Sequence, residues 1–278
     1  VGIDLGEETM LLAVACVLAC TAPEPPDRPA PTDEPAAAPL PSEGVVMAAD
    51  GVPIAFEAAG SAETTLVFVH CWACDRTFWN DQLDVFAGDY RVVALDLAGH
   101  GESGTERGSW SVGGLAEDVA TVLEELDLRD VVLVGHSMGG PVSLLTVPLA
   151  RERVVGVVLV DTVHNAEVGW SAEDAAPVIA AFSEDYEATT RQFTPMLFPP
   201  DADPEIVARV TEGAVATDHT AAIQLLADFP NLDLAAILAA AEVPVRAVNA
   251  APLGQMIPET AIGAIRRSPS GARRSIHS

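Results

Sequence analysis

Lysine is absent from the sequence, and all 14 basic residues are arginines. They stand against 41 acidic residues, which gives a formal net charge of -27 at pH 7. Proteins that bind nucleic acids or anionic membranes cover phosphate groups with clusters of basic residues. The composition therefore argues against nucleic acid and anionic lipid as partners. The acidic excess is typical of a surface that keeps a protein soluble.

Cysteine is also scarce, with four residues at positions 16, 20, 71 and 74. Cys71 and Cys74 form a C-x-x-C pair, a spacing typical of a metal half-site or a redox pair. No second pair follows, so we expect both to line a loop, with a local disulfide as the alternative in an oxidising compartment. The six histidines show no H-E-x-x-H spacing, and the sequence has no glycine-rich nucleotide-binding loop. We therefore expect neither a metal nor a cofactor.

The first 20 residues end in an apolar run, MLLAVACVLAC at 10–20, which is too short to span a bilayer as a helix. An apolar run closed by small residues and a cysteine resembles a bacterial lipoprotein signal, in which Cys20 would carry the lipid. No basic residue precedes the run, and Leu18 is bulkier than usual for its place. Residues 1–9 are acidic, so Met10 is a candidate for the true first residue. The alternative to a signal is a misassigned start with an irrelevant apolar stretch.

Residues 21–43 hold eight prolines together with Ala, Asp and Glu, and almost nothing that a core could bury. This composition predicts a semi-rigid extended linker rather than a folded element. A linker directly behind a lipidated cysteine fits a protein of the bacterial cell envelope, in contact with the membrane only through the anchor at Cys20. A cytoplasmic location is the alternative.

From residue 44 onward, strands and helices are predicted to alternate. Continuous apolar runs are typical of strands buried on both faces, and the sequence has them at 65–70, 90–95, 131–134 and 154–160. Two strand-like segments before them join at Asp50-Gly51, a strong hairpin signal. Helical spacing of apolar residues occurs at 76–88, 111–127 (with Ser111 as the expected N-cap) and 138–150. This alternation favours an α/β fold, a mostly parallel sheet with helices on both faces.

The alternation breaks over residues 165–241, which are rich in Ala, Asp and Glu and carry several aromatic residues. We interpret this segment as a helical cap inserted between two parts of one core, 44–164 and 242–278. The second part contains a predicted strand at 243–248, a short helix near 258–267 and an atypical tail at 268–278.

Residues 135–139, GHSMG, fit the pattern G-x-S-x-G between a predicted strand and a predicted helix. In such a nucleophile elbow the serine sits on a sharp, strained turn, so the residues two positions before and after it must be small. Gly135 and Gly139 meet this demand, and the following helix directs its N-terminus at developing negative charge. Ser137 is therefore the expected nucleophile.

Three motifs follow successive predicted strands in order: HCW at 70–72, DLAGHGES at 96–103 and the elbow at 135–139. With them the chain resembles, over about residues 44–267, the α/β hydrolases of the capped esterase and peptidase type. The resemblance implies that the backbone N–H groups of Trp72 and Met138 form an oxyanion hole. Cys71 stands where that family usually has glycine. His100, in the second motif, is expected to be structural.

In that family the acid that orients the catalytic histidine usually follows the strand after the cap. Here that place, VNAAP at 248–252, has no carboxylate. The other placement is the end of the strand before the cap, where this sequence has Asp161. A carboxylate there can orient a histidine, so we expect Asp161 to be the acid, with a solvated or helix-capping residue as the alternative. His164 is expected to belong to the hinge of the cap.

The family's catalytic histidine follows a last strand, but the sequence after Ile265 reads RRSPSGARRSIHS and has no apolar run. This tail carries four arginines and no acid, an abrupt change in an otherwise acidic chain. Two interpretations follow. Either His277 is the base, or the true last strand, histidine and helix are missing through a shifted reading frame or a truncated gene. In the second case the strand at 243–248 would be an exposed sheet edge.

The expected function is a serine hydrolase that cleaves a carboxylic ester or related acyl bond through an acyl-enzyme on Ser137. The catalytic set would be Ser137, Asp161 and His277, and the partner a small molecule that enters an apolar pocket lined by aromatic residues of the cap. Serine at the elbow disfavours epoxide hydrolases and dehalogenases, which use aspartate there, whereas an aminopeptidase or a carbon–carbon bond hydrolase remains open. The alternative from another class is a catalytically impaired or truncated hydrolase fold that acts as an envelope binding protein.

Overall fold

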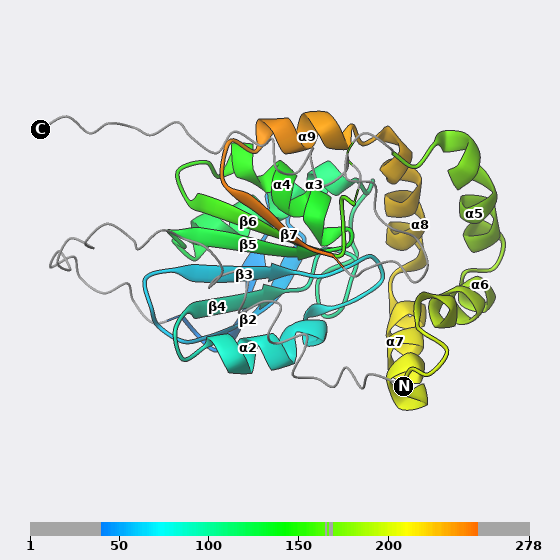
Figure 1. Cartoon of the computed structure of the whole chain (residues 1–278), viewed down its shortest axis with the longest axis horizontal. Coiled ribbons are helices and arrows are strands. Elements are labelled where there is room, and N and C mark those ends of the chain that lie inside the picture. Colours follow the sequence, from blue (N-terminus) through cyan, green and yellow to red (C-terminus); the bar gives the residue numbers. More distant parts are fainter. Residues whose placement is uncertain (1–39, 165, 167–168, 250–278) are drawn as a thin grey trace, which may run out of the picture.

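The computed structural model describes residues 40–164, 166 and 169–249 (Figure 1). The signal-like segment with Cys20, most of the linker, the helix predicted near 258–267 and the tail with His277 lie outside the described residues. Within them the predicted α/β-hydrolase fold class is confirmed, because a seven-stranded, mostly parallel sheet carries helices on both faces.

The strands lie in the order β1-β2-β4-β3-β5-β6-β7. β1 and β2 form an antiparallel hairpin, β2 is antiparallel to β4, and the other neighbours are parallel. Their bounds are β1 Glu43–Met47, β2 Pro53–Ala59, β3 Thr65–Val69, β4 Arg91–Leu95, β5 Val131–His136, β6 Val154–Val160 and β7 Val245–Val248. β3 lies between β4 and β5 with every residue buried, which is why its sequence is apolar without alternation.

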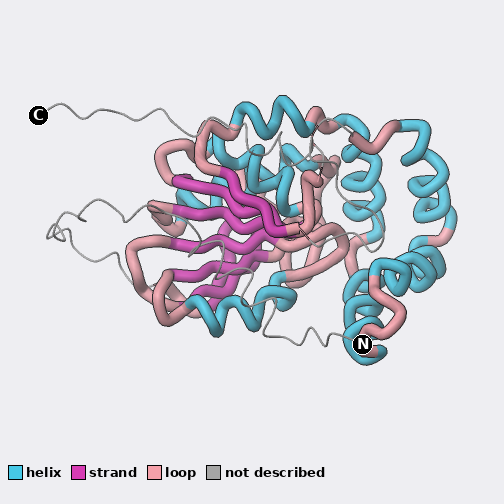
Figure 2. Tube along the Cα trace, in the orientation of Figure 1, coloured by secondary structure: helices cyan, strands magenta, loops and turns pink. Residues whose placement is uncertain are grey.

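Alternate side chains of β3 enter two separate apolar layers. Figure 2 shows the helices that lie on the two faces of the sheet. Phe68 packs against Trp79 with ring centroids 5.0 Å apart, on the face covered by η1 and α2. Val67 and Val69 join the larger cluster on the face covered by α3 and α4. The bounds of these helices are η1 Arg76–Trp79, α2 Asn80–Phe86, α3 Val112–Glu125 and α4 Gly139–Leu149.

Two local predictions are confirmed, and one element is divided. Ser111 caps α3, and its side chain accepts a hydrogen bond from the N–H of Gly114 at 3.0 Å. Gly51 has a φ of 88° in the β1–β2 turn. The helix predicted at 76–88 is split into η1 and α2, because the backbone of Trp79 (φ -106°, ψ 6°) departs from helical values at their junction.

The segment predicted as a cap contains helices only, within the described residues. Their bounds are α5 Ala172–Glu184, α6 Tyr186–Phe193, η2 Thr194–Leu197, α7 Pro204–Ala216, α8 His219–Asp228, η3 Phe229–Asn231 and α9 Leu234–Ala240. Figure 1 shows α5 to α8 together beyond one end of the strands. Phe182, Tyr186, Ala222 and Leu226 form the apolar interior of this group.

α9, the last helix of the segment predicted as a cap, contacts the core. It packs against α4, and Leu238 lies in the main core cluster. α9 is the crossover helix that brings the chain from the cap back to β7, and its apolar sequence serves that contact.

No single helix of the described residues is long and apolar enough to cross a membrane. The stretches His219–Asn231 and Leu234–Ala240 reach that length and composition only as a pair, with a bend of 85° between them. Both stretches bury side chains in the main cluster, Leu225 from the first and Leu238 from the second.

Arg107 joins the β1–β2 turn to α3. Its Nε donates to Asp50 Oδ2 at 2.8 Å, and its two terminal nitrogens donate to the Asp118 carboxylate at 2.8 and 2.9 Å. The side chain of Asp118 is 5% exposed and that of Arg107 is 10% exposed. Burial raises the pKa of Asp118, and the contact with Arg107 opposes that rise.

Candidate active site

Ser137 occupies a strained turn between β5 and α4. Its φ is 49°, a left-handed value that is costly for a residue other than glycine. Backbone contacts hold it there: its N–H donates to Val160 O at 3.1 Å, and its carbonyl accepts from Gly140 N–H at 2.9 Å and from Thr162 Oγ1 at 2.8 Å. The strained backbone at this turn therefore coincides with the residue that the sequence predicts as the nucleophile.

Close backbone packing explains the two glycines of the elbow. A Cβ on Gly135 would lie 2.1 Å from the carbonyl oxygen of Gly139, so the turn closes only without it. A Cβ on Gly139 would lie 2.3 Å from Val69 O and 2.8 Å from His70 O. The start of α4 therefore packs directly on the chain that leaves β3.

This packing brings the two predicted oxyanion donors to the same end of the sheet. Trp72 follows β3 and Met138 follows Ser137. Within the part of the chain that the structure describes, neither backbone N–H donates to a protein acceptor. Both N–H groups therefore lack a protein acceptor among the described residues, as the predicted oxyanion hole requires.

His70 orients the peptide group that ends in the Trp72 N–H. Its Nε2 accepts a hydrogen bond from Leu97 N–H at 2.9 Å, so Nδ1 carries the proton and donates to Cys71 O at 2.7 Å. Because a trans peptide is planar, fixing the Cys71 carbonyl also fixes the N–H of Trp72, which points the opposite way. Burial lowers the pKa of His70 to about 4, so the imidazole is neutral near pH 7.

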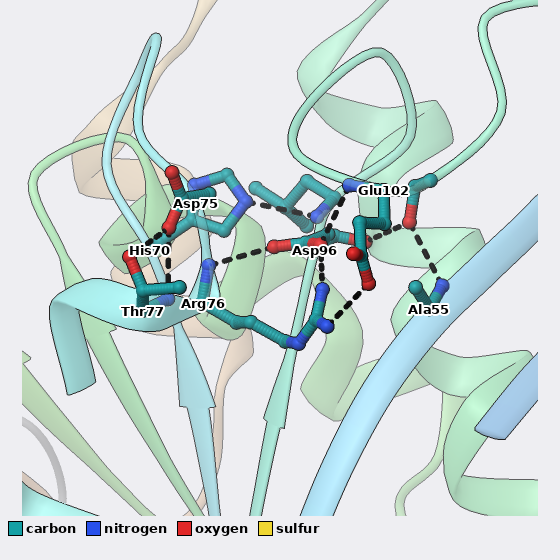
Figure 3. Close-up of polar contacts among 9 residues, drawn as sticks. Ala55, His70, Asp75, Arg76, Thr77, Asp96 and Glu102 are labelled. Atoms are coloured by element: carbon teal, nitrogen blue, oxygen red, sulfur yellow. Dashed lines mark hydrogen bonds and ion pairs between the residues drawn. The ribbon is translucent and has the colours of Figure 1, made fainter. Parts of the chain in front are cut away.

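A buried carboxylate joins the loops that follow β3 and β4 (Figure 3). Asp96 is fully buried and accepts from Arg76 N–H at 2.7 Å and from Glu102 N–H at 2.8 Å. The guanidinium of Arg76 pairs with both Asp96 and Glu102. Ser103 Oγ donates to Asp96 O at 2.6 Å and accepts from Ala55 N–H at 2.9 Å, which ties the same loop to β2.

Cys71 and Cys74 form a disulfide, with their Cα atoms 5.3 Å apart. The sequence led us to expect two cysteines lining a loop, so this expectation is corrected in favour of the alternative. The reason is local: a turn in which Cys74 N–H approaches Cys71 O at 3.4 Å brings the two side chains together. Among the described residues, no three His, Cys, Asp or Glu side chains gather in a way that could hold a metal ion.

Asp161 closes β6 beside the elbow. Its φ is 47°, and its N–H donates to Val248 O at 2.8 Å. The residue before it accepts from Ser137 N–H, and the residue after it donates to Ser137 O, so Asp161 and Ser137 lie on adjoining turns. Asn249, at the end of β7, accepts from Thr162 N–H at 3.1 Å through its side-chain oxygen.

His164 is the functional candidate that the sequence reasoning missed. Its Nε2 lies 3.1 Å from Asp161 Oδ1, and the two side chains are 40% and 46% exposed. We had expected a hinge residue, although a histidine three positions after the proposed acid is itself a signal. His277, the predicted base, lies outside the described residues.

Two other histidines are poorly suited to act as a base. His100 is 1% exposed, and burial lowers its pKa to about 3. Its ring lies 5.1 Å from that of His70, whose pKa is also low. A group so weakly basic is a poor acceptor for a serine proton near neutral pH. These two side chains therefore have structural roles at the loops.

The described geometry defines a class of protein: an α/β fold with a strained serine turn at the carboxyl ends of parallel strands and a helical segment beyond them. Comparison with known families agrees. The model of the alpha/beta hydrolase family matches residues 66–270, and the chain belongs to that family.

Individual curated relatives match a shorter part of the chain than the family model does. The chain is 41% identical over 105 residues to the dihydrolipoyllysine-residue acetyltransferase component of an acetoin cleaving system from Pseudomonas putida, which is 38% of this chain and 28% of that protein. It is 41% identical over 92 residues to the non-heme chloroperoxidase CPO-A1 of Kitasatospora aureofaciens, 33% of each chain. The chain thus matches about a third or less of the length of these curated relatives.

A solved structure matches more of the fold. The crystal structure of a hydrolase from Pseudomonas aeruginosa PA01 superposes with a TM-score of 0.71 at 28% identity. The match covers 82% of this chain and 87% of that one. Similarity on this scale extends the family assignment through the cap as well as the sheet.

Proposed function

We propose that this protein is a serine hydrolase that cleaves a carboxylic ester or related acyl bond. The observation that carries the proposal is Ser137, held at a φ of 49° between two glycines that backbone packing requires. Such an elbow presents a hydroxyl at the carboxyl ends of the strands and the N-terminus of a helix. The hydrolase from Pseudomonas aeruginosa supports the reaction class.

In the proposed mechanism Ser137 Oγ attacks the substrate carbonyl while a histidine accepts the hydroxyl proton. The developing oxyanion takes hydrogen bonds from the N–H groups of Trp72 and Met138. One such donor typically lowers the barrier by ~3 kcal/mol. The histidine then protonates the leaving group, and a water activated by the same base releases the acyl group from Ser137.

Asp161 is the proposed acid, and two histidines compete for the role of base. Family position favours His277. The 3.1 Å contact with Asp161 favours His164, since an acid that orients a histidine must touch it. Both assignments use the same nucleophile and the same acid. They differ only in which histidine is the base, so replacing each histidine in turn distinguishes them.

The proposed substrate carries an apolar group. The indole of Trp72 meets the cap with its ring centroid 5.2 Å from that of Phe182 and 6.5 Å from that of Tyr186. The residue that supplies the oxyanion N–H therefore has aromatic cap residues as neighbours. An acyl or alcohol portion lying against the half-buried indole of Trp72 would be bound by apolar contact.

An envelope location is the proposal for where the enzyme works, through lipidation of Cys20. The disulfide between Cys71 and Cys74 supports it, because such bonds persist in oxidising compartments and are rare in the cytosol. Fractionation of cells that express the full chain tests the anchor. The wild type should sediment with membranes and Cys20→Ser should not; a soluble wild type would contradict the proposal.

Hydrolysis of short-chain p-nitrophenyl esters by the full chain is the test of function. Ser137→Ala should abolish turnover, and labelling by a fluorophosphonate should be lost in the same variant. His277→Ala and His164→Ala, run in parallel, identify the base as the one whose loss lowers kcat by at least about 100-fold. A wild type no more active than Ser137→Ala would favour the alternative, a hydrolase fold that binds without turnover.

A further inference from the structure

We propose that the Cys71–Cys74 disulfide is a positioning device for the oxyanion hole, so that turnover depends on its being oxidised. The inference rests on the proposed function, because it assigns the disulfide to the loop that supplies the Trp72 N–H. It goes beyond that function by making the redox state of one bond a determinant of rate.

The bond encloses the proposed oxyanion donor. Trp72 and Ala73 are the two residues between the linked cysteines, which are 8% and 7% exposed. Ala73 is buried and has a φ of 54°. A left-handed conformation is unfavourable for an alanine, so the open chain would tend to leave it. The cross-link limits this change in the backbone conformation of Ala73, because Cys71 and Cys74 can no longer move apart.

Two further contacts fix the same residue from other sides. The carbonyl of Cys71 accepts from His70 Nδ1–H at 2.7 Å, and this sets the direction of the Trp72 N–H through the planar peptide. The indole N–H of Trp72 donates to Ala222 O at 2.8 Å, which anchors the side chain in α8 of the cap. The imidazole orients the peptide, the cap holds the side chain, and the disulfide limits the turn between them.

Reduction releases the third of these restraints. A dithiol reductant gives two electrons and two protons: the Sγ–Sγ bond breaks, two cysteine thiols form, and the reductant becomes a cyclic disulfide. The turn can then relax and the Trp72 N–H is no longer pre-organised. Because an oxyanion donor acts in the transition state and not on bound substrate, kcat should fall while KM changes little.

The first experiment compares kcat and KM of the full chain in its oxidised form, after treatment with dithiothreitol, and after removal of the reductant and reoxidation. Losing an oxyanion donor outright costs about 100- to 1,000-fold, so loosening one should cost about 10-fold or more in kcat, with KM within about 2-fold. Reoxidation should restore the rate. Unchanged kcat in the reduced enzyme overturns the proposal.

Matched variants separate this bond from other effects of the reductant. Cys71→Ser/Cys74→Ser should have the low kcat of the reduced enzyme and should not respond to dithiothreitol. Cys16→Ser/Cys20→Ser, which keeps the disulfide, should respond as the wild type does. A reductant response that persists in the first variant or disappears in the second contradicts the assignment.

Hydrogen exchange gives a readout that does not depend on turnover. Amides of the peptide 66–79 should exchange faster in the reduced form and in Cys71→Ser/Cys74→Ser, while peptides from α3 keep their protection. Should the wild type hydrolyse nothing above the Ser137→Ala control, the proposed function fails, and this measurement still decides whether the disulfide holds the loop. Equal exchange in the two forms overturns the positioning role.

Discussion

The Nε2 atom of His70 accepts a hydrogen bond from the backbone N–H of Leu97 at 2.9 Å, so one imidazole joins the loops that follow β3 and β4. A protonated ring would carry a hydrogen on Nε2 and could not accept this bond. The ring is fully buried, so its charged form would also lose its hydration. Both effects favour the neutral form, which is the form that orients Cys71 O.

Stability should therefore fall at acid pH. Burial lowers the pKa of His70 to about 4, below the ordinary value of 6.5, so the unfolded chain binds the extra proton between these two values. Its contribution to stability is complete above pH 6.5 and is lost as the pH falls toward 4. We expect a loss on the order of 3 kcal/mol from this residue, measured by urea denaturation across that window.

A histidine without this environment supplies the control. His70→Asn should reduce the slope of unfolding free energy against pH by about half a proton at pH 6.5 and by almost one proton at pH 5, a range where few carboxylates titrate. The exposed His219 replaced by glutamine should leave that slope unchanged. Identical slopes for the wild type and His70→Asn would show that His70 does not remain neutral in the folded protein.

Gly139 tests the packing of the elbow. Gly139→Ala places a Cβ 2.3 Å from Val69 O, a backbone atom that cannot rotate away. We expect a loss of about 1–3 kcal/mol in unfolding free energy and a large fall in ester hydrolysis, because the loop with Trp72 must shift. Gly113→Ala is the matched control, since no atom lies within 4 Å of its added Cβ. Equal stability and activity in both variants would rule out the close approach.

The sheet and the elbow could be predicted because their signals are local. The continuous apolar run of β3 predicts a strand that is buried on both faces, and the glycine spacing at 135–139 predicts a tightly packed turn. The structure has both. The packing of α9 on the core could not be predicted, because a helix of the cap and a crossover helix can have equally apolar sequences. Only the contact with α4 tells them apart.

Two side-chain pairings of the candidate site, Cys71 with Cys74 and His164 with Asp161, could not be predicted from sequence spacing. C-x-x-C fits a loop, a metal half-site or a disulfide, and the turn geometry at Cys71 selects the third. The contact between His164 and Asp161 likewise depends on where the chain turns after β6. Both are decided by backbone conformation at residues with positive φ, Ala73 and Asp161, which propensity does not indicate.

Exchanging the side chains of Asp161 and Asn249 tests which strand end supplies the acid. Asp161→Asn should lower kcat by about 100- to 10,000-fold, because the base loses its orienting charge. Asn249 reaches Thr162 N–H at 3.1 Å, so its side chain ends at the same loop. Asp161→Asn/Asn249→Asp should recover at least about 10-fold in kcat. Full activity in Asp161→Asn would remove Asp161 from the mechanism, and kcat from stopped-flow or steady-state assays decides between these results.

Removing the Arg107 side chain should lower the free energy of unfolding, for reasons unrelated to catalysis. Arg107→Met leaves the carboxylate of Asp118 buried and uncompensated, and losing one partner of such a pair costs about 3–5 kcal/mol. Arg107→Met/Asp118→Leu should recover most of that loss, because no charge remains buried. Arg191→Met is the control, since Arg191 and Glu212 are 40% and 64% exposed and exposed pairs contribute little to stability. Urea denaturation followed by circular dichroism gives all three values, and a cost for Arg107→Met no larger than that for Arg191→Met would show that the buried pair does not hold the β1–β2 turn to α3.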